Sequence, residues 1–146
     1  MQSKDITERI SEDQIRRIKD ILLEKGVLFA YIFGSYARGE QHPRSDLDIG
    51  VYLKEPVDNM SMVLMNLIYE ISKIVDGIEI DVRILNKVSL EFLFKVITDG
   101  RLLFSIDDVK QIQFEKRIFF GYLDFKPALD TYYYYMHKHL RETGNL

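Results

Sequence analysis

The sequence predicts one α+β domain, close to the α/β class, with a small mixed β-sheet flanked by helices and a C-terminal helical tail. The 146 residues, 47% of them hydrophobic, are enough to build a single core. Segments with the apolar spacing of a helix alternate with segments that have the apolar pattern of a strand up to about residue 104, and aromatic residues are concentrated after residue 106. We therefore expect a domain over residues 1–106 and, over residues 107–146, a helical, aromatic-rich extension that is not an independent domain.

A helix, a buried strand and a tight turn are predicted first. Ser11 and Gln14 form a capping box, isoleucines follow at helical spacing, and the helix should close at Gly26. Residues 27–33 are a continuous apolar run, which favours a buried strand. Residues 34–39 should then form a turn with a short helix, because the run ends at a glycine.

Strands and helices alternate in the rest of the predicted domain. The expected elements are, in chain order, a strand over residues 46–53, a helix over residues 64–75, a strand over residues 78–84, a helix over residues 89–99 and a short strand over residues 102–104. The third of these alternates cleanly between apolar and charged residues, so its Asp81 should be displayed on the exposed face.

The tail should contain two helices. One carries Val109, Ile112 and Ile118 at helical spacing, and Pro127 should start the second. Four consecutive tyrosines cover every side of a helix and cannot all face one core, so some are expected at an interface; the alternative is that they pack on the domain's own sheet. The candidate partner-binding residues are Phe120, Tyr122, Tyr132, Tyr133, Tyr134 and Tyr135.

Asp46 and Asp48 stand at the head of a predicted strand. Alternate residues of a strand lie on one face about 6.6 Å apart, so these two carboxylates should point the same way. Asp81 can complete the site if its strand is a neighbour; otherwise it is plain surface beside Glu79 and Arg83. Mg²⁺ prefers oxygen ligands of this kind, and three carboxylates suit two metal ions. Asp46, Asp48 and Asp81 are therefore the candidate catalytic and metal-binding residues.

The turn after the first strand is a candidate phosphate site. Gly34 and Ser35 can offer backbone N–H groups to phosphate oxygens, and Arg38 could bind a phosphate bidentately. The alternatives are local: Gly34 terminates the strand, Ser35 caps the short helix, and Arg38 forms a surface ion pair with Glu40 or Asp46. Both the phosphate site and the acidic site are thus expected within a short stretch of chain.

Gly34-Ser35-Tyr36-Ala37-Arg38-Gly39, followed by Ser45-Asp46-Leu47-Asp48-Ile49, resembles the signature of the polymerase-beta-like nucleotidyltransferase superfamily. The likeness covers roughly residues 27–104 and is greatest to the minimal nucleotidyltransferases. It implies a nucleotidyltransferase fold in which Ser35 holds the terminal phosphates of the substrate ATP. By the same resemblance, Asp46 and Asp48 are the ligands of Mg²⁺, two ions being expected, and Asp81 is the third acidic residue.

Many minimal nucleotidyltransferases are antitoxins that transfer AMP from ATP to a tyrosine of a HEPN-domain ribonuclease toxin. The resemblance therefore implies an antitoxin-type protein adenylyltransferase that neutralises a HEPN toxin by modifying a hydroxyl and forms a hetero-oligomer with it. A homodimer remains an option for the chain alone. Two other functions stay open: a non-catalytic antitoxin that acts by direct binding, and a small-molecule nucleotidyltransferase similar to the aminoglycoside enzymes.

The composition of the chain argues against several functional classes of protein. The net charge of −3 argues against direct nucleic-acid binding, which usually needs a basic surface. The chain has no cysteine, so disulfides and thiolate chemistry are excluded. We also expect no membrane association and a cytoplasmic location, because the polar N-terminus lacks a signal-peptide core and no apolar run reaches the length of a membrane span.

Overall fold

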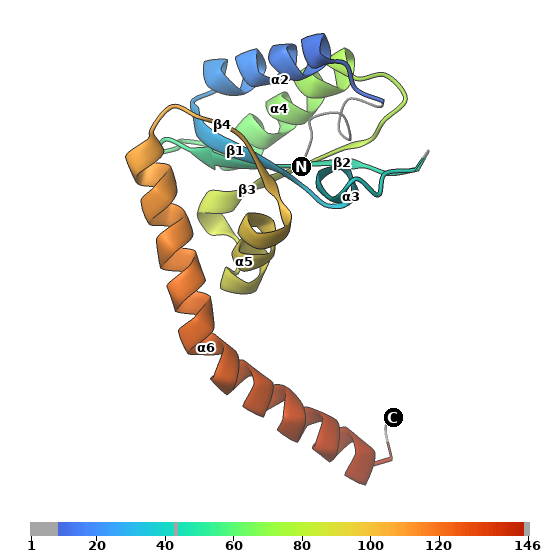
Figure 1. Cartoon of the computed structure of the whole chain (residues 1–146), viewed down its shortest axis with the longest axis vertical. Helices are drawn as coiled ribbons and strands as arrows, with labels where there is room; N and C mark the ends of the chain where they lie inside the picture. The colour runs from blue at the N-terminus through green and yellow to red at the C-terminus, as the bar shows by residue number, and fades with distance from the viewer. Residues whose placement is uncertain (1–8, 43, 145–146) are drawn as a thin grey trace.

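The computed structural model describes residues 9–42 and 44–144. Figure 1 shows four strands, the helices around them and a long C-terminal helix that leaves the body of the molecule. The elements are, in chain order, α2 (Glu12–Glu24), β1 (Val27–Phe33), α3 (Ser35–Arg38), β2 (Leu47–Leu53), α4 (Met60–Ile74), β3 (Ile80–Ile84), the 3₁₀ helix η1 (Leu85–Lys87), α5 (Leu90–Asp99), β4 (Arg101–Ser105) and α6 (Asp108–Glu142).

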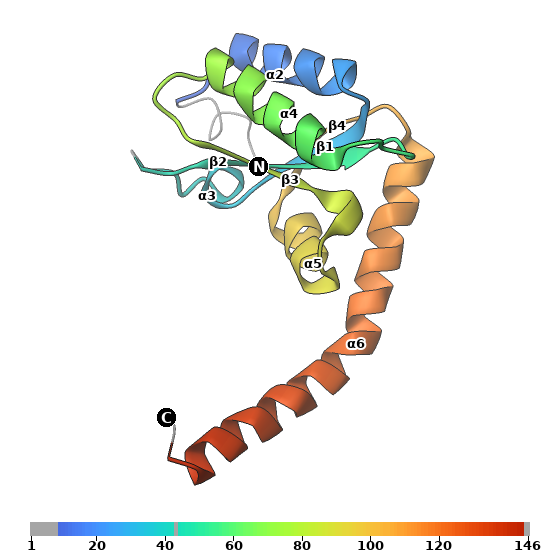
Figure 2. The same cartoon turned by 180° about the vertical axis from the view of Figure 1, so that it is seen from behind.

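The four strands form one mixed sheet in the order β3-β2-β1-β4. β1 is antiparallel to both of its neighbours, whereas β2 and β3 are parallel. Figures 1 and 2 show α2 and α4 on one face of the sheet and α5 and α6 on the other. This arrangement confirms the predicted fold class, a small mixed sheet flanked by helices with a helical tail.

Local sequence signals account for most of the helix ends. Ser11 and Gln14 make the predicted capping box of α2, in which the Ser11 side chain accepts a hydrogen bond from the Gln14 backbone N–H. Asn59 and Ser89 cap α4 and α5 in the same way, so backbone donors at these helix starts are satisfied. Gly100 ends α5, as predicted.

Each face of the sheet has its own hydrophobic core. On the α2 and α4 face, the core includes Leu22, Ile49 and Ile71, all fully buried. On the opposite face, aromatic residues dominate: the rings of Phe29 and Tyr52 stack with centroids 4.7 Å apart, and Phe114 of α6 contacts both. Aromatic pairs in these geometries add to the stabilisation from buried area. The first half of α6 is thereby part of the body.

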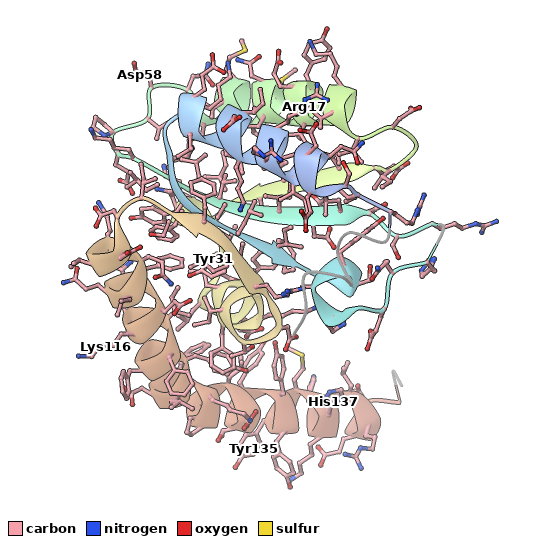
Figure 3. The ribbon with its side chains drawn as sticks, turned by 45° about the horizontal axis from the view of Figure 1, so that its top comes forward. Arg17, Tyr31, Asp58, Lys116, Tyr135 and His137 are labelled. Atoms are coloured by element: carbon pink, nitrogen blue, oxygen red, sulfur yellow. The ribbon has the colours of Figure 1, made fainter. Side chains whose placement is uncertain are left out.

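A buried polar cluster fastens α6 to the centre of the sheet. The Tyr31 hydroxyl donates a hydrogen bond to Glu115 Oε1 over 2.8 Å and accepts one from Gln111 Nε2 over 3.1 Å. Burial, as the largest cause, raises the pKa of Tyr31, so its hydroxyl stays protonated and remains a donor. Figure 3 shows Tyr31 between the sheet and α6.

The strands differ from prediction only at their ends. β2 begins at Leu47, so Asp46 directly precedes the strand that was expected to include it, and β3 begins at Ile80 rather than at residue 78. β4 is one residue longer at each end than predicted, and η1 was not predicted at all. Such differences arise where hydrogen bonding to a neighbouring strand, and not periodicity, sets the boundary.

The prediction of two helices in the tail was wrong. α6 is a single helix with Pro127 inside it. Proline removes one backbone donor and crowds the preceding turn, which bends a helix without necessarily ending it. The Thr131 hydroxyl donates to the Pro127 carbonyl over 2.9 Å, so that carbonyl has a partner. Figures 1 and 2 show α6 bending partway along its length, so that its second half passes below α5 and extends away from the body of the molecule. The division at residues 106 and 107 stays a prediction.

In the described part of the chain, no helix has the length and apolar character needed to cross a membrane.

Candidate active site

The parallel pairing of β2 and β3 brings two predicted site residues together. Asp48 of β2 and Asp81 of β3 are register partners, and neighbouring strands lie about 4.8 Å apart. Both carboxylates lie on the face of the sheet that α5 and α6 cover, because Leu47, Ile49 and Val82, which alternate with them, belong to the core on the other face. The condition set by the sequence, that the two strands be neighbours, is met.

The turn after β1 lies against the same carboxylates. Phe33, the last residue of β1, is the register partner of Asp48, so the chain enters the turn at Gly34 directly beside that aspartate. Gly34 has a φ of 73°, and a Cβ added to it would overlap the Asp48 carboxylate. Ser35 follows as the first residue of α3. The predicted phosphate turn and the acidic residues therefore occupy one end of the sheet.

Asp48 is electrostatically unusual. Burial, followed by the negative charges of Asp81 and Asp46, raises its pKa to about 6, although Arg83 and Arg38 act in the opposite direction. The negative charges of Asp81 and Asp46 thus add to burial in disfavouring the ionised form of Asp48. A cation bound beside Asp48 would offset this effect of the two neighbouring carboxylates.

Two arginines border the acidic residues. Arg83 Nε lies 3.4 Å from Asp81 Oδ1, and its guanidinium lies over the Phe92 ring of α5 at 5.6 Å from the centroid. Arg38 Nε lies 3.0 Å from Glu40 Oε2, which is one of the local alternatives open to it in the sequence. Sequence reasoning overlooked Arg83, although its place two residues after Asp81 on the exposed face was a usable signal.

Asp46 is more exposed than its two partners. It lines a cavity of about 350 Å³ together with Arg44, Ser45, Gly77 and Glu79. Ser45 is buried, and its hydroxyl accepts a hydrogen bond from the His42 backbone N–H over 2.8 Å. The Leu47 N–H donates to the Glu79 carbonyl over 2.8 Å, which joins the start of β2 to the approach of β3. These bonds hold the backbone on either side of Asp46.

The acidic residues fit a magnesium ion in the chemistry of their donors. Asp46, Asp48 and Asp81 offer only carboxylate oxygens, the ligands that Mg²⁺ prefers. Within residues 9–42 and 44–144, however, no three acidic or histidine side chains converge into a ready-made cluster. One or two carboxylates plus substrate phosphates are the usual holders of Mg²⁺, so these residues suit a metal that arrives with its nucleotide.

The predicted partner-binding aromatics fall into two groups. The Tyr122 ring stacks on Phe94 of α5 with centroids 3.9 Å apart and is half-buried within the body. Phe120 and the four tyrosines Tyr132–Tyr135 are exposed, and the rings of these tyrosines contact one another, Tyr132 with Tyr133 and Tyr134 with Tyr135. The tyrosines therefore do not pack on the domain's own sheet, which was the alternative.

Comparison with known proteins places this site in a family. Residues 16–109 match the family model described as polymerase beta, nucleotidyltransferase. The chain is 44% identical over 73 residues to a Methanocaldococcus jannaschii protein named "Putative protein adenylyltransferase MJ0435", a match that covers 50% of this chain and 75% of that protein. It is 32% identical over 75 residues to the protein adenylyltransferase MntA of Shewanella oneidensis, covering 51% of this chain and 52% of that protein.

Solved structures share the fold. A toxin–antitoxin crystal structure with AMP-PNP superposes with a TM-score of 0.66 at 24% identity, covering 80% of this chain and 96% of that chain. A chain from the complex of the tri-AMPylated Shewanella oneidensis HEPN toxin with the MNT antitoxin gives a TM-score of 0.63 at 20% identity, covering 82% of this chain and 96% of that chain. The acidic pair, the glycine turn and the matched region agree: the chain belongs to the polymerase beta nucleotidyltransferase family.

Proposed function

We propose that this chain is a magnesium-dependent protein adenylyltransferase and the antitoxin of a HEPN-domain toxin, to which it transfers AMP from ATP. The acceptor is a hydroxyl, for which a tyrosine of the toxin is the expected residue. Membership of the nucleotidyltransferase family and the names of the two adenylyltransferase relatives support this proposal.

The observation that carries the proposal is the register pairing of Asp48 with Asp81 beside the Gly34 turn. Catalysis of nucleotidyl transfer needs negative ligands for a cation and backbone donors for phosphate oxygens within reach of one another. Two carboxylates directly opposite each other on neighbouring strands, as Asp48 and Asp81 are, destabilise the strand pair, so the fold alone gives no reason for this pairing. The pair is therefore best explained by function.

Each group has a role in the proposed reaction. Asp46 and Asp48 hold Mg²⁺, which when bound neutralises phosphate charge; Ser35 and the turn's backbone N–H groups hold the triphosphate. The acceptor oxygen attacks the α-phosphorus of ATP, the bond from that phosphorus to the bridging oxygen breaks, and pyrophosphate leaves. The acceptor's proton passes to the Asp81 carboxylate. Arg38 can exchange Glu40 for a phosphate.

Intact mass spectrometry provides the test. The chain is co-expressed with a HEPN-domain protein from the same genome, and the intact mass of that protein is measured after incubation with ATP and Mg²⁺. We expect mass increments of one or more AMP units with the wild-type chain and none with Asp46→Asn. An unmodified HEPN protein that is nonetheless inhibited would contradict the catalytic proposal.

A second function is favoured by one observation. The exposed aromatic residues of the second half of α6 could let the chain neutralise a toxin by contact alone. The two functions separate in the Asp46→Asn chain: neutralisation by contact survives this substitution, whereas neutralisation by AMP transfer does not.

A further inference from the structure

Arg83 is the arginine that pairs with an acidic residue of the candidate site. It follows Asp81 by two positions on β3, so both side chains lie on the face of the sheet that α5 and α6 cover. Its Nε lies 3.4 Å from Asp81 Oδ1, whereas Arg38, the other arginine that borders these residues, pairs with Glu40. The charge of Arg83 also opposes the rise in the pKa of Asp48. One guanidinium therefore acts on both register partners.

An aromatic ring positions this guanidinium. The Arg83 guanidinium lies over the Phe92 ring of α5, 5.6 Å from the centroid. The Phe92 ring in turn meets the Phe33 ring edge to face, with centroids 5.5 Å apart. Phe33 is the last residue of β1 and directly precedes the Gly34 turn. Contacts through two phenyl rings therefore connect Arg83 to the start of the proposed phosphate turn.

The ion pair adds little to the stability of the fold. The Arg83 and Asp81 side chains keep 53% and 41% of their surface exposed, and solvent weakens ion pairs at such exposure. The pair also engages a carboxylate that is proposed to serve the reaction. Arg83 and a magnesium ion are both cations that would use the Asp81 carboxylate, so they compete for it. The pairing is therefore better explained by a role in substrate binding than by folding.

The charge of the substrate decides the outcome of this competition. A lone Mg²⁺ ion would add positive charge beside Arg83, whereas Mg²⁺ together with ATP adds a net negative charge. The planar guanidinium of arginine suits two phosphate oxygens at once, which the ammonium of lysine does not. Arg83 can therefore leave Asp81 and gain a phosphate partner when cation and nucleotide arrive together. A cation that arrives alone offers no such partner.

We propose that Arg83 is an exchangeable counter-ion of the active site, in a proposal that rests on the function above. In the absence of nucleotide Arg83 pairs with Asp81, and when Asp81 binds Mg²⁺ the guanidinium passes to a phosphate of ATP. Through this exchange the site binds Mg²⁺ with ATP in preference to Mg²⁺ alone. The exchange adds Arg83 to the phosphate-binding residues that were predicted from the sequence.

Opposite effects on two ligands test this exchange. Arg83→Gln removes the guanidinium, and Lys87→Gln is the matched control, because Lys87 is exposed in η1 and its substitution changes the net charge equally. Arg83→Lys keeps the charge without the planar pair of donors. Binding of Mn²⁺ alone is measured by electron paramagnetic resonance of the free ion. Binding of AMP-PNP in saturating Mg²⁺ is measured by calorimetry.

We expect Arg83→Gln to bind Mn²⁺ alone about three- to tenfold more tightly than wild type, because Asp81 loses its competing cation. The same variant should bind AMP-PNP about tenfold more weakly, because a charge-assisted hydrogen bond to phosphate is lost. Arg83→Lys should bind Mn²⁺ like wild type and AMP-PNP with intermediate affinity. Lys87→Gln should stay within about twofold of wild type for both ligands, and circular dichroism should be the same for all variants.

Three results would overturn the proposal. Unchanged or weaker Mn²⁺ binding by Arg83→Gln would show that the guanidinium does not compete for Asp81. Unchanged or tighter AMP-PNP binding by the same variant would show that Arg83 does not pass to a phosphate. Equal effects of Arg83→Gln and Lys87→Gln would reduce both changes to net charge.

Failure of the proposed function gives a different result. A wild-type chain that binds Mn²⁺ and AMP-PNP but transfers no AMP to a HEPN-domain protein would contradict the adenylyltransferase function and leave the exchange at Arg83 intact. A wild-type chain that binds no AMP-PNP would contradict both proposals.

Discussion

The body of the molecule and the second half of α6 use apolar residues in opposite ways. In the body, residues such as Leu22, Phe29 and Ile49 are fully buried between sheet and helices. Beyond the bend in α6, residues of the same character stay exposed on a helix that touches little of the body. Burial of apolar side chains stabilises the body, whereas the exposed apolar side chains in the second half of α6 contribute little to the stability of the fold. The candidate active site lies in the body, and the exposed aromatic residues of the alternative function lie in the second half of α6.

The largest expected effect lies in the body. Asp48→Asn should lower AMP transfer by at least about a thousandfold, because it removes the charged oxygen ligand that lies opposite Asp81. Transfer to the HEPN-domain protein is measured by intact mass over time. Asp58→Asn is the matched control, since Asp58 is exposed in the loop that follows β2, beyond the opposite end of that strand from Asp48. Figure 3 shows Asp58 on that loop. Equal rates of AMP transfer in the two variants would show that Asp48 has no part in the reaction.

Two glycines with positive φ allow the effect of backbone strain on stability to be distinguished from an effect on ATP binding. Gly34 and Gly26 both have a positive φ, 73° and 83°, but a Cβ at Gly34 would overlap the Asp48 carboxylate whereas one at Gly26 meets nothing within 4 Å. Gly34→Ala and Gly26→Ala should each lower the free energy of unfolding by about 1–2 kcal/mol. Only Gly34→Ala should also abolish ATP binding, measured by calorimetry with Mg²⁺. Retained ATP binding in Gly34→Ala would argue against a nucleotide site at this turn.

The hydrogen bonds that join Tyr31 to α6 can be removed without changing the acidic residues or the exposed second half of α6. Tyr31→Phe removes the hydroxyl that bonds Glu115 and Gln111, leaving these two side chains without their shared partner. We expect the free energy of unfolding to fall by about 1–2 kcal/mol in urea titration. Tyr52→Phe keeps its stacked ring and is the control, since among the described residues no hydrogen bond is seen for its hydroxyl. Equal losses in both variants would mean that the hydrogen bonds contribute nothing.

The smallest expected effect is on pH dependence. The folded pKa of Asp48, about 6, lies above its unfolded value of 3.8, so the folded state binds more protons in this window. Stability should therefore fall as the pH rises from about 4 to about 6, and the cost should persist above that. Without divalent cations, Asp48→Asn should remove this dependence and stabilise the chain by about 1 kcal/mol at pH 7.5, because solvent screens part of the charge repulsion. A wild-type and a variant curve that run parallel would contradict the raised pKa.

The sequence by itself determined the local elements and the kinds of residue at the site. Capping at Ser11, the apolar run of β1 and the alternation around Asp48 and Asp81 are properties of neighbours in the chain, which periodicity reports directly. The resemblance of the Gly34 turn and the aspartate pair to the nucleotidyltransferase signature was likewise readable without coordinates.

Only the tertiary structure decided which strand pairs with which and in what register. The parallel alignment of β2 with β3 sets Asp81 opposite Asp48, and the close approach of Gly34 to Asp48 follows from the β1 register. The tertiary structure also decided that α6 continues as one helix through Pro127. The physical reason is that strand partners, registers and helix bends are fixed by contacts between residues far apart in the chain, whereas a periodic pattern records only which face each residue occupies.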